Sequence, residues 1–553
     1  MNATPVTIQA ARLIDDGHAL AATHLRIADG RIAAIGGAEV QQGGDLLVEH
    51  GGRLLPGLID AHMHLLPGAG ALAATFGVTT LIDQFSKPEV IDPERAAIRA
   101  AESGTGPVRA GLRTSSIGAT APGGHPTMAY SPIPYVRGPQ DAPQFVADRI
   151  AEGATHLKII YDDGMGAALS IPTLGEETIV ALVEQAHGHG LPVVAHVSTA
   201  AGALTVVRCG VDALAHAPFD HMSDLDVAGV AERGVTVIAT LDITDGFPDE
   251  QGRMPLLADA GLAPLLTPRW RRVLERQARR WMPPGAPDGA TARENVRRLH
   301  AAGVRILAGT DAPNPGLVFG ASLHRELQLL VRAGLAPAEA LVAATTAPAE
   351  LFGLDRGRLR VGAPADLLLV DGDPTRDITA TSTLVRIWCN GREVNADHYP
   401  GGTEERETIT ALKETNAKIV AAIKEAWPGI PGPEEVRTDE GELLGRVIPS
   451  AGGWTALASF GGILAEAVSH SEAVEVLHSR GLSVLAQPWW VRLPGEESWQ
   501  EVRLMEVHAD RVRLRWADPL VEQPAAGQWF EAEDLDFATT PAPSATPGTG
   551  SGD

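Results

Sequence analysis

Short, almost continuously apolar runs alternate with longer amphipathic segments between residues 56 and 348. Runs of strand length lie at residues 79–82, 156–160, 192–196, 213–216, 235–239 and 305–308. Helical patterns such as 176–189 and 200–209 separate them. Apolar strands that alternate with helices indicate a parallel sheet covered by helices. The pattern predicts an α/β fold with a (β/α)8 TIM barrel over residues 56–348, and a doubly wound open sheet is the alternative.

The pattern changes on both sides of this region. Residues 1–55 and 349–397 contain short strands separated by turns, and we expect them to form one small flanking β-sandwich. Residues 398–433 are expected to form a helical linker that ends at a proline-rich stretch. Residues 434–540 predict a C-terminal accessory module, either α+β or a small barrel, whose tryptophans fill a core or form a patch for a partner. Residues 541–553 are expected to be disordered.

Composition and charge exclude several classes of protein. The chain has 553 residues and a net charge of −24, from 45 Lys and Arg against 69 Asp and Glu. This acidic balance leaves no evident basic surface for nucleic acid. Two cysteines are too few for a disulfide framework, and neither a membrane span nor a signal peptide is visible. We therefore expect a cytoplasmic protein that acts on a small molecule, with homo-oligomerisation left open.

Two histidines at the end of an apolar run are the first sign of chemistry. His62 and His64 occupy positions i and i+2, which point to the same side of a strand and can begin a metal site. Such a pair alone is weak evidence. Four more residues of suitable type stand at or near the carboxyl ends of predicted strands: Lys158, His196, His216 and Asp311. Barrel enzymes carry their active sites at that end, and imidazoles with a carboxylate suit zinc-like ions.

These residues carry a resemblance to a known family. Pro56-Gly57-Leu58-Ile59-Asp60-Ala61-His62-Met63-His64 resembles the first-strand motif of the amidohydrolase superfamily, and the match covers about residues 5–397. It continues in order through Lys158, His196, His216 and Gly309-Thr310-Asp311. Gly123-Gly124-His125 and the position of Lys158 make the chain most similar to the imidazolonepropionase-like and Xaa-Pro dipeptidase-like members.

The resemblance implies a binuclear metal site. His62, His64 and Asp311 would hold the more buried ion, and His196 and His216 would hold the second. Lys158, carbamylated by carbon dioxide, would bridge the two. Zinc is the expected metal, with manganese, cobalt or iron as alternatives. A metal-bound hydroxide would attack the substrate carbonyl, and Asp311 would take its proton and pass it to the leaving amine.

Two further residues enter the expected site through the same resemblance. His125, on a loop after two glycines, would donate a hydrogen bond to the substrate carbonyl, and a solvent-exposed loop histidine is the alternative. Dipeptidase-like relatives often carry a tyrosine three residues after the fifth-strand histidine, where this chain has Thr199. Tyr161 could take that role, although a packed tyrosine is at least an equal alternative.

The sequence therefore predicts an enzyme that hydrolyses an amide, peptide or cyclic-amide carbonyl. A lactonase or esterase on the same two ions is the alternative, and the ligand set does not separate these reactions. A deaminase is disfavoured, because those sites usually use one ion and no carbamylated lysine. A non-catalytic binding protein on the same fold would typically have lost ligands, whereas all six are present here.

Overall fold

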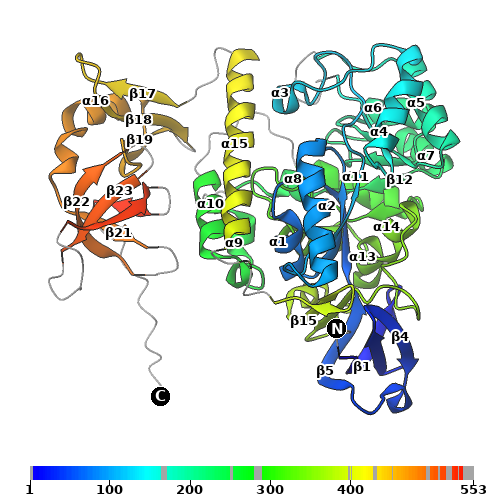
Figure 1. Ribbon diagram of the computed structural model, residues 1–553. Helices are drawn as coiled ribbons and strands as arrows, with labels where there is room; N and C mark the ends of the chain where they lie inside the picture. The colour runs from blue at the N-terminus through cyan, green and yellow to red at the C-terminus, as the bar shows by residue number, and fades with distance from the viewer. Residues whose placement is uncertain are drawn as a thin grey trace, which may run out of the picture. The chain divides into compact units, whose positions relative to one another are not determined.

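The computed structural model describes residues 4–163, 171–248, 253–278, 289–395, 399, 402–426, 433–450, 453–493, 498–508, 511–517, 526–532 and 535–539 (Figure 1). The chain divides into two compact units. The first comprises Met1–Asp249, Met254–Leu265 and Gly285–Ile423, and the second comprises Glu250–Arg253, Leu266–Pro284 and Lys424–Asp553. Within the described residues, no helix combines the length and the apolar character needed to cross a bilayer.

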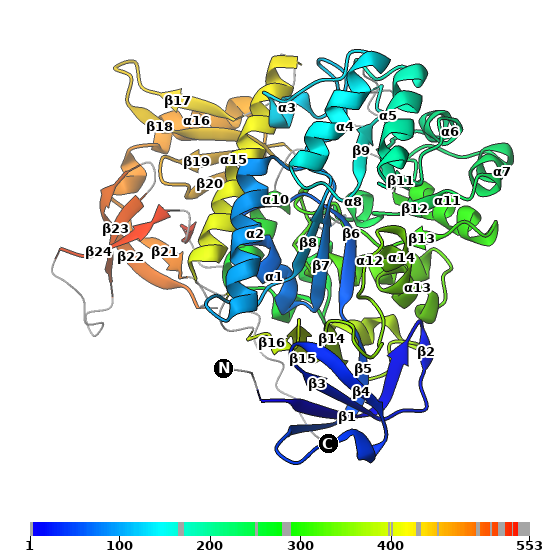
Figure 2. The ribbon, with the colours of Figure 1, turned by 45° about the vertical axis from the view of Figure 1, so that its right-hand side comes forward.

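Parallel strands form the centre of the first unit, in one sheet of three strands and one of five (Figure 2). They are β6 (Leu58–Met63), β7 (Val78–Asp83), β8 (Gly111–Thr114), β9 (Leu157–Ile160), β10 (Val193–His196), β11 (Ala213–Ala215), β12 (Thr236–Ile238) and β13 (Ile306–Leu307). Hydrogen bonds join the sheets at both ends: Ala61 N donates to Ala308 O at 3.1 Å, and Ala119 N donates to Lys158 O at 2.8 Å. The predicted parallel α/β core is confirmed.

Helices follow these strands along the chain and lie outside them (Figure 2). They are α1 (Ala69–Thr75), α2 (Pro88–Ser103), α3 (Thr127–Tyr130), α4 (Ala142–Ala151), α5 (Glu176–Gly188), α6 (Ala200–Arg208), α7 (Asp224–Glu232), α8 (Asp242–Asp245), α9 (Pro255–Ala258), α11 (Gly289–Ala301), α12 (Ala321–Arg332), α13 (Pro337–Ala343) and α14 (Thr346–Leu351). N-capping side chains fix where some of these helices begin. The Thr199 side chain accepts from Gly202 N at the start of α6, and Ser223 and Asp226 form a capping box on α7.

The two flanking segments form one eight-stranded sheet, and its arrangement as a β-sandwich stays a prediction. Its strands are β1 (Val6–Asp15), β2 (His18–Ala19), β3 (His24–Ala28), β4 (Arg31–Gly36), β5 (Leu46–Pro56), β14 (Leu367–Val370), β15 (Leu384–Cys389) and β16 (Arg392–Glu393). The order is β16-β15-β14-β5-β1-β3-β4, with β2 paired to β1. Because β14 pairs directly with β5, the ladder runs unbroken from one segment to the other. Ile8, Leu54, Leu367 and Trp388 share its buried core.

The helix after this sheet, α15 (Thr403–Ala426), packs on the first unit at its start. Thr408 Oγ1 donates to Pro67 O at 2.6 Å, and Glu404 forms an ion pair with the buried Arg109. Arg109 also bonds to Glu94 of α2 at 2.9 Å. The segment expected to be a linker is therefore anchored over its first turns, because it carries the carboxylate and hydroxyl that complete these bonds.

The second unit contains two antiparallel sheets of its own. The first consists of β17 (Glu434–Arg437), β18 (Leu443–Ser450), β19 (Gly453–Ala458) and β20 (Ile463–Val468), with α16 (His470–Arg480) packed on it. The second consists of β21 (Trp489–Arg492), β22 (Gln500–Val507), β23 (Arg511–Trp516), β24 (Gln528–Glu531) and β25 (Asp536–Ala538). Trp489 is fully buried, 4.9 Å from the Phe460 ring, which fits the core-filling role expected of the tryptophans. Residues 541–553 lie outside the described part of the chain.

The second unit also takes a segment from the region expected to be barrel. Helix α10 (Pro268–Ala278) belongs to it, and Glu275 of α10 lies 3.5 Å from Arg492 of β21. The apolar runs around residues 235–239 and 305–308 predicted the neighbouring parallel strands β12 and β13 correctly, but the connection between these strands contains a helix that belongs to the second unit. The sequence carries no local signal for this excursion, since α10 has the amphipathic pattern of an ordinary helix.

Candidate metal centre

The ends of β6 and β13 bring three of the expected ligands together. Asp311 Oδ1 lies 3.2 Å from His62 Nε2 and 2.9 Å from His64 Nε2. Two nitrogen or oxygen ligands of one tetrahedral zinc ion lie about 3.3 Å apart, so these separations suit shared coordination. Gly309 permits the close approach of the two strands, because a Cβ there would stand 2.9 Å from His62 N and 2.7 Å from an Ile238 methyl.

The ends of β10 and β11 bring in two more histidines. His196 Nδ1 lies 3.0 Å from His216 Nε2, and the His216 ring is 4.7 Å from the His62 ring. The other nitrogen of His216, Nδ1, lies 2.7 Å from Thr240 Oγ1, which holds the ring in place. One ligand atom each from His62, His216 and Asp311 falls within a 4.8 Å cluster. The two sets of ligands that were predicted to hold separate ions therefore lie next to each other.

Lys158 points into this buried region with no hydrogen bond to its amine. The residue is 1% exposed, and Nζ has no partner within the described structure. Burial lowers its pKa to about 7, so much of the amine is neutral near physiological pH. Gly118 makes room for the Lys158 stem, since a Cβ at that position would lie 3.1 Å from Lys158 Cγ.

The electrostatics of the site favour the neutral forms of His62 and His216 beside an ionised Asp311. Burial, followed by the nearby Lys158 charge, lowers the pKa of His62 to about 3. Burial also holds the pKa of His216 well below its usual value. Burial alone would raise the pKa of Asp311, but His62 and His216 outweigh it and hold that pKa well below the ordinary range. Neutral imidazole and carboxylate are the forms that bind metal.

Several polar atoms of this site are buried and have no hydrogen bond to any described residue. They are both ring nitrogens of His62, Nε2 of His196, Oδ1 of Asp311 and Nζ of Lys158. His62 Nε2 and Asp311 Oδ1 are close, but they are not aligned as donor and acceptor. Buried polar atoms are almost always satisfied in native proteins. In a metal site such atoms are satisfied by the ions that they bind. The clustered atoms therefore fit divalent ions as ligands.

A second layer, which the sequence reading did not assign, holds the ligands in position. Asp60 accepts from His62 N at 3.1 Å, from Thr310 N at 3.0 Å and from Thr310 Oγ1 at 2.7 Å. Asn314 Nδ2 donates to Asp311 Oδ2 at 2.9 Å, and the Phe85 carbonyl lies 3.1 Å from His64 Nδ1. Asp60 lies within the motif from Pro56 to His64, and this position was the sign in the sequence that it belongs to the site.

The structure places His125 beside the cluster and Tyr161 against a helix. His125 is an exposed residue, and its ring stacks on the His196 ring with the ring centres 4.9 Å apart. A Cβ on Gly202, in the first turn of α6, would lie 3.4 Å from the Tyr161 ring, so that ring packs beside the helix. Thr199, where relatives often carry a tyrosine, serves as the α6 cap.

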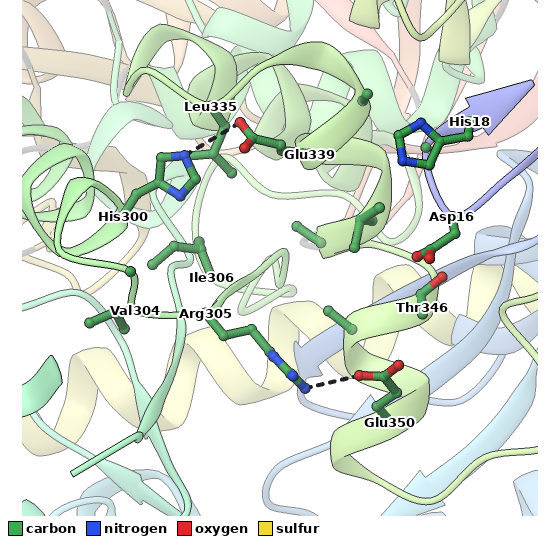
Figure 3. A pocket seen from close by; sticks show the side chains of 16 residues that line it. Asp16, His18, His300, Val304, Arg305, Ile306, Leu335, Glu339, Thr346 and Glu350 are labelled. Carbon is green, nitrogen blue, oxygen red and sulfur yellow. Dashed lines mark hydrogen bonds and ion pairs between the residues drawn. The ribbon is translucent and has the colours of Figure 1, made fainter. Parts of the chain in front are cut away.

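Another cavity, of about 380 Å³, lies where β13 begins, at the opposite end of the strand from Asp311 (Figure 3). The β1–β2 turn, α11, α13 and α14 contribute its lining. Two ion pairs lie within its lining: His300 with Glu339 at 3.4 Å and Arg305 with Glu350 at 3.1 Å. Active sites of barrel enzymes lie at the carboxyl ends of the strands, so the histidine cluster is the stronger candidate.

Known proteins are similar to this chain in sequence or in fold. An uncharacterized protein of Mycobacterium tuberculosis is 28% identical over 367 residues, which is 64% of this chain and 87% of that protein. The imidazolonepropionase of Rubrobacter xylanophilus is 46% identical over 86 residues, 15% of this chain and 20% of the relative. A solved Xaa-Pro dipeptidase with bound methionine matches with a TM-score of 0.57 at 21% identity, over 71% of this chain and 100% of its own. At 21% identity, the similarity to the Xaa-Pro dipeptidase supports a shared fold and nothing further.

Fold and site together define a hydrolase built on parallel α/β strands. The profile of the amidohydrolase family matches residues 53–394, more than half of the sequence, so the chain belongs to this family. It is a hydrolytic enzyme that acts on carbon–nitrogen bonds. The family resemblance read from the sequence is confirmed.

Proposed function

We propose that this enzyme uses two divalent metal ions to hydrolyse an amide, peptide or cyclic-amide bond, and that β6 to β13 close into an eight-stranded barrel around them. One observation carries the proposal. Four histidines, Asp311 and an unpaired buried lysine converge at the carboxyl ends of parallel strands. The bridges that join the two sheets at both ends support closure of the barrel.

The ligands divide into two groups by their contacts. His62, His64 and Asp311 would hold the first ion, since Asp311 Oδ1 approaches both rings. His196 and His216 would hold the second. A neutral Lys158 amine can add to carbon dioxide, forming a nitrogen–carbon bond and releasing one proton, and the resulting carbamate would bridge both ions. Zinc suits this mixture of imidazole and carboxylate, with manganese, cobalt and iron as alternatives.

The reaction places distinct tasks on the chain. Bound ions would supply a hydroxide nucleophile near neutral pH and polarise the scissile carbonyl. As the new carbon–oxygen bond forms, Asp311 accepts the proton of the attacking water, and it passes that proton to the nitrogen as the carbon–nitrogen bond breaks. Asn314 fixes Asp311 Oδ2 at 2.9 Å and leaves Oδ1 toward the histidines. His125, whose ring stacks on that of His196, would donate a ring N–H to the substrate carbonyl.

The substitution Lys158→Ala tests the bridged site. We expect the variant to lose bound metal and activity together, because the bridge disappears, and short-chain carboxylic acids should partly restore both. Lys418→Ala, on the exposed side of α15, is the matched control and should behave as the parent. Unchanged metal content and turnover in Lys158→Ala would disprove the bridged centre.

A substrate screen decides the bond that is cleaved. N-acyl amino acids, dipeptides, cyclic amides and lactones should be compared on the zinc, manganese and cobalt forms. We expect the amides to be the better substrates, because Asp311 can return a proton to a leaving nitrogen. Preference for lactones would favour the esterase alternative, and one metal ion per chain at saturation would favour a deaminase-like site.

A further inference from the structure

Asp162 lies beside His196, one of the four clustered histidines. Its Oδ2 lies 3.5 Å from Nε2 of His196, on the opposite side of that ring from His216. The two side chains are 15% and 14% exposed, so the pair is largely shielded from water. Among the described residues, Nε2 of His196 has no hydrogen bond, and Asp162 is a nearby carboxylate that can accept one.

The strand register explains why this aspartate stands where it does. Ile160 at the end of β9 pairs with His196 at the end of β10. Asp162 and Ser198 each lie two residues beyond this pair, so they come beside each other. Ser198 Oγ donates to Asp162 Oδ1 at 2.9 Å, which fixes one carboxylate oxygen and leaves the other turned to His196. Tyr161 N also donates to His196 O at 3.1 Å and keeps the two strand ends together.

We propose that Asp162 is the positioning residue of the second metal site: it receives Nε2–H of His196 and so leaves Nδ1 of His196 as the metal-binding nitrogen. This inference rests on the proposed binuclear function. A neutral imidazole carries its proton on one nitrogen and its lone pair on the other, so a carboxylate at Nε2 selects the form that binds through Nδ1. A carboxylate partner also makes the ring a stronger ligand.

The opposite histidine is arranged in the complementary way. His216 has Thr240 Oγ1 at Nδ1, which leaves Nε2 for the metal. The two free nitrogens, Nδ1 of His196 and Nε2 of His216, are 3.0 Å apart. That separation is near the roughly 3.3 Å expected between two nitrogens on one tetrahedral ion. Asp162 and Thr240 would thus orient the two rings so that the lone pairs of Nδ1 of His196 and Nε2 of His216 face the same metal position.

The test compares metal binding by the full chain with Asp162→Ala, Asp162→Asn and Ser198→Ala. Cobalt(II) is titrated into the metal-free protein, and both the ions bound per chain and the visible absorption are followed. We expect Asp162→Ala to weaken the second cobalt by about 10- to 100-fold and to alter its absorption band, while the first ion binds as before. Asp162→Asn, whose amide oxygen can still accept, should recover part of this loss. Asp92→Asn, 71% exposed on α2, is the matched control.

Ser198→Ala keeps the inference open to test if Asp162→Ala fails to fold. It should weaken the second cobalt in the same direction, by a smaller factor, because it frees the carboxylate without removing it. Two ions bound with parental affinities in Asp162→Ala would overturn this inference alone. So would a rise in KM with unchanged cobalt affinity, which would assign the carboxylate to substrate. If the parent chain binds only one ion at saturation, the binuclear function itself fails.

Discussion

Single buried acceptors decide whether the ligands of this site hold their geometry. Asp60 is the clearest case, because it takes three hydrogen bonds from two neighbouring strands that each carry ligands. Burial raises its pKa to about 7, against the opposing effect of those donors. Burying this carboxyl group is energetically unfavourable, but its hydrogen bonds fix the separation of His62 and Asp311.

Replacing this acceptor should be expensive. Asp60→Ala leaves the donors of His62 N, Thr310 N and Thr310 Oγ1 without their partner, each at about 1–3 kcal/mol. We expect the free energy of unfolding of the metal-free protein to fall by about 3 kcal/mol or more, measured by urea denaturation. Asp92→Ala on the exposed face of α2 should stay within about 0.5 kcal/mol of the parent. A similarly small change in Asp60→Ala would contradict this role.

At the level of elements, α12 carries a buried histidine that ties it to two distant segments. His324 Nε2 lies 2.7 Å from Phe76 O, and Nδ1 lies 3.0 Å from Thr381 Oγ1. Burial lowers the pKa of His324 to about 4. In the unfolded chain the ring titrates near its ordinary value of about 6.5. Between these two values the unfolded state binds more protons, so stability falls as the pH is lowered.

His324→Gln removes this titration and should flatten the dependence of stability on pH. We expect the parent to lose up to about 1.4 kcal/mol per pH unit from this group in the window between about 6.5 and 4. The variant should lack that component when unfolding is measured at several pH values on metal-free protein. His478→Gln, at an exposed position of α16, is the control and should keep the parental slope. Equal slopes in His324→Gln and the parent would show that His324 does not titrate in this way.

The same scale shows how far sequence reasoning reaches. His196, His216 and Asp311 could be found because each follows a short apolar run, and the family motif joined them to His62 and His64. Asp162 could not, because its contact with His196 depends on the register between β9 and β10. The register of β14 on β5 could not be predicted for a similar reason, because this pairing joins residues more than 300 positions apart.

At the level of the whole molecule, the proposed ligands all lie in the first unit, and the second unit has an independent core. Trp489, Val502 and Phe537 are buried within that second core, far along the chain from any ligand. The expectations of a cytoplasmic location and of no nucleic-acid partner stay predictions, and homo-oligomerisation stays open. What the division into units does predict is that metal should stabilise one part of the chain and not the other.

Removal of metal from the full chain should therefore shift one of two unfolding transitions. A ligand that binds only the folded state stabilises it by about 2.7 kcal/mol at a hundredfold excess over Kd. We expect a chelator to lower the melting temperature of the first unit by several degrees in calorimetry, while the transition of the second unit stays in place. The Lys158→Ala chain should show little response to the chelator, since its first transition already lacks the bridged ions. An equal shift of both transitions would mean that the two units unfold together, and no shift would mean that metal binding does not stabilise the fold.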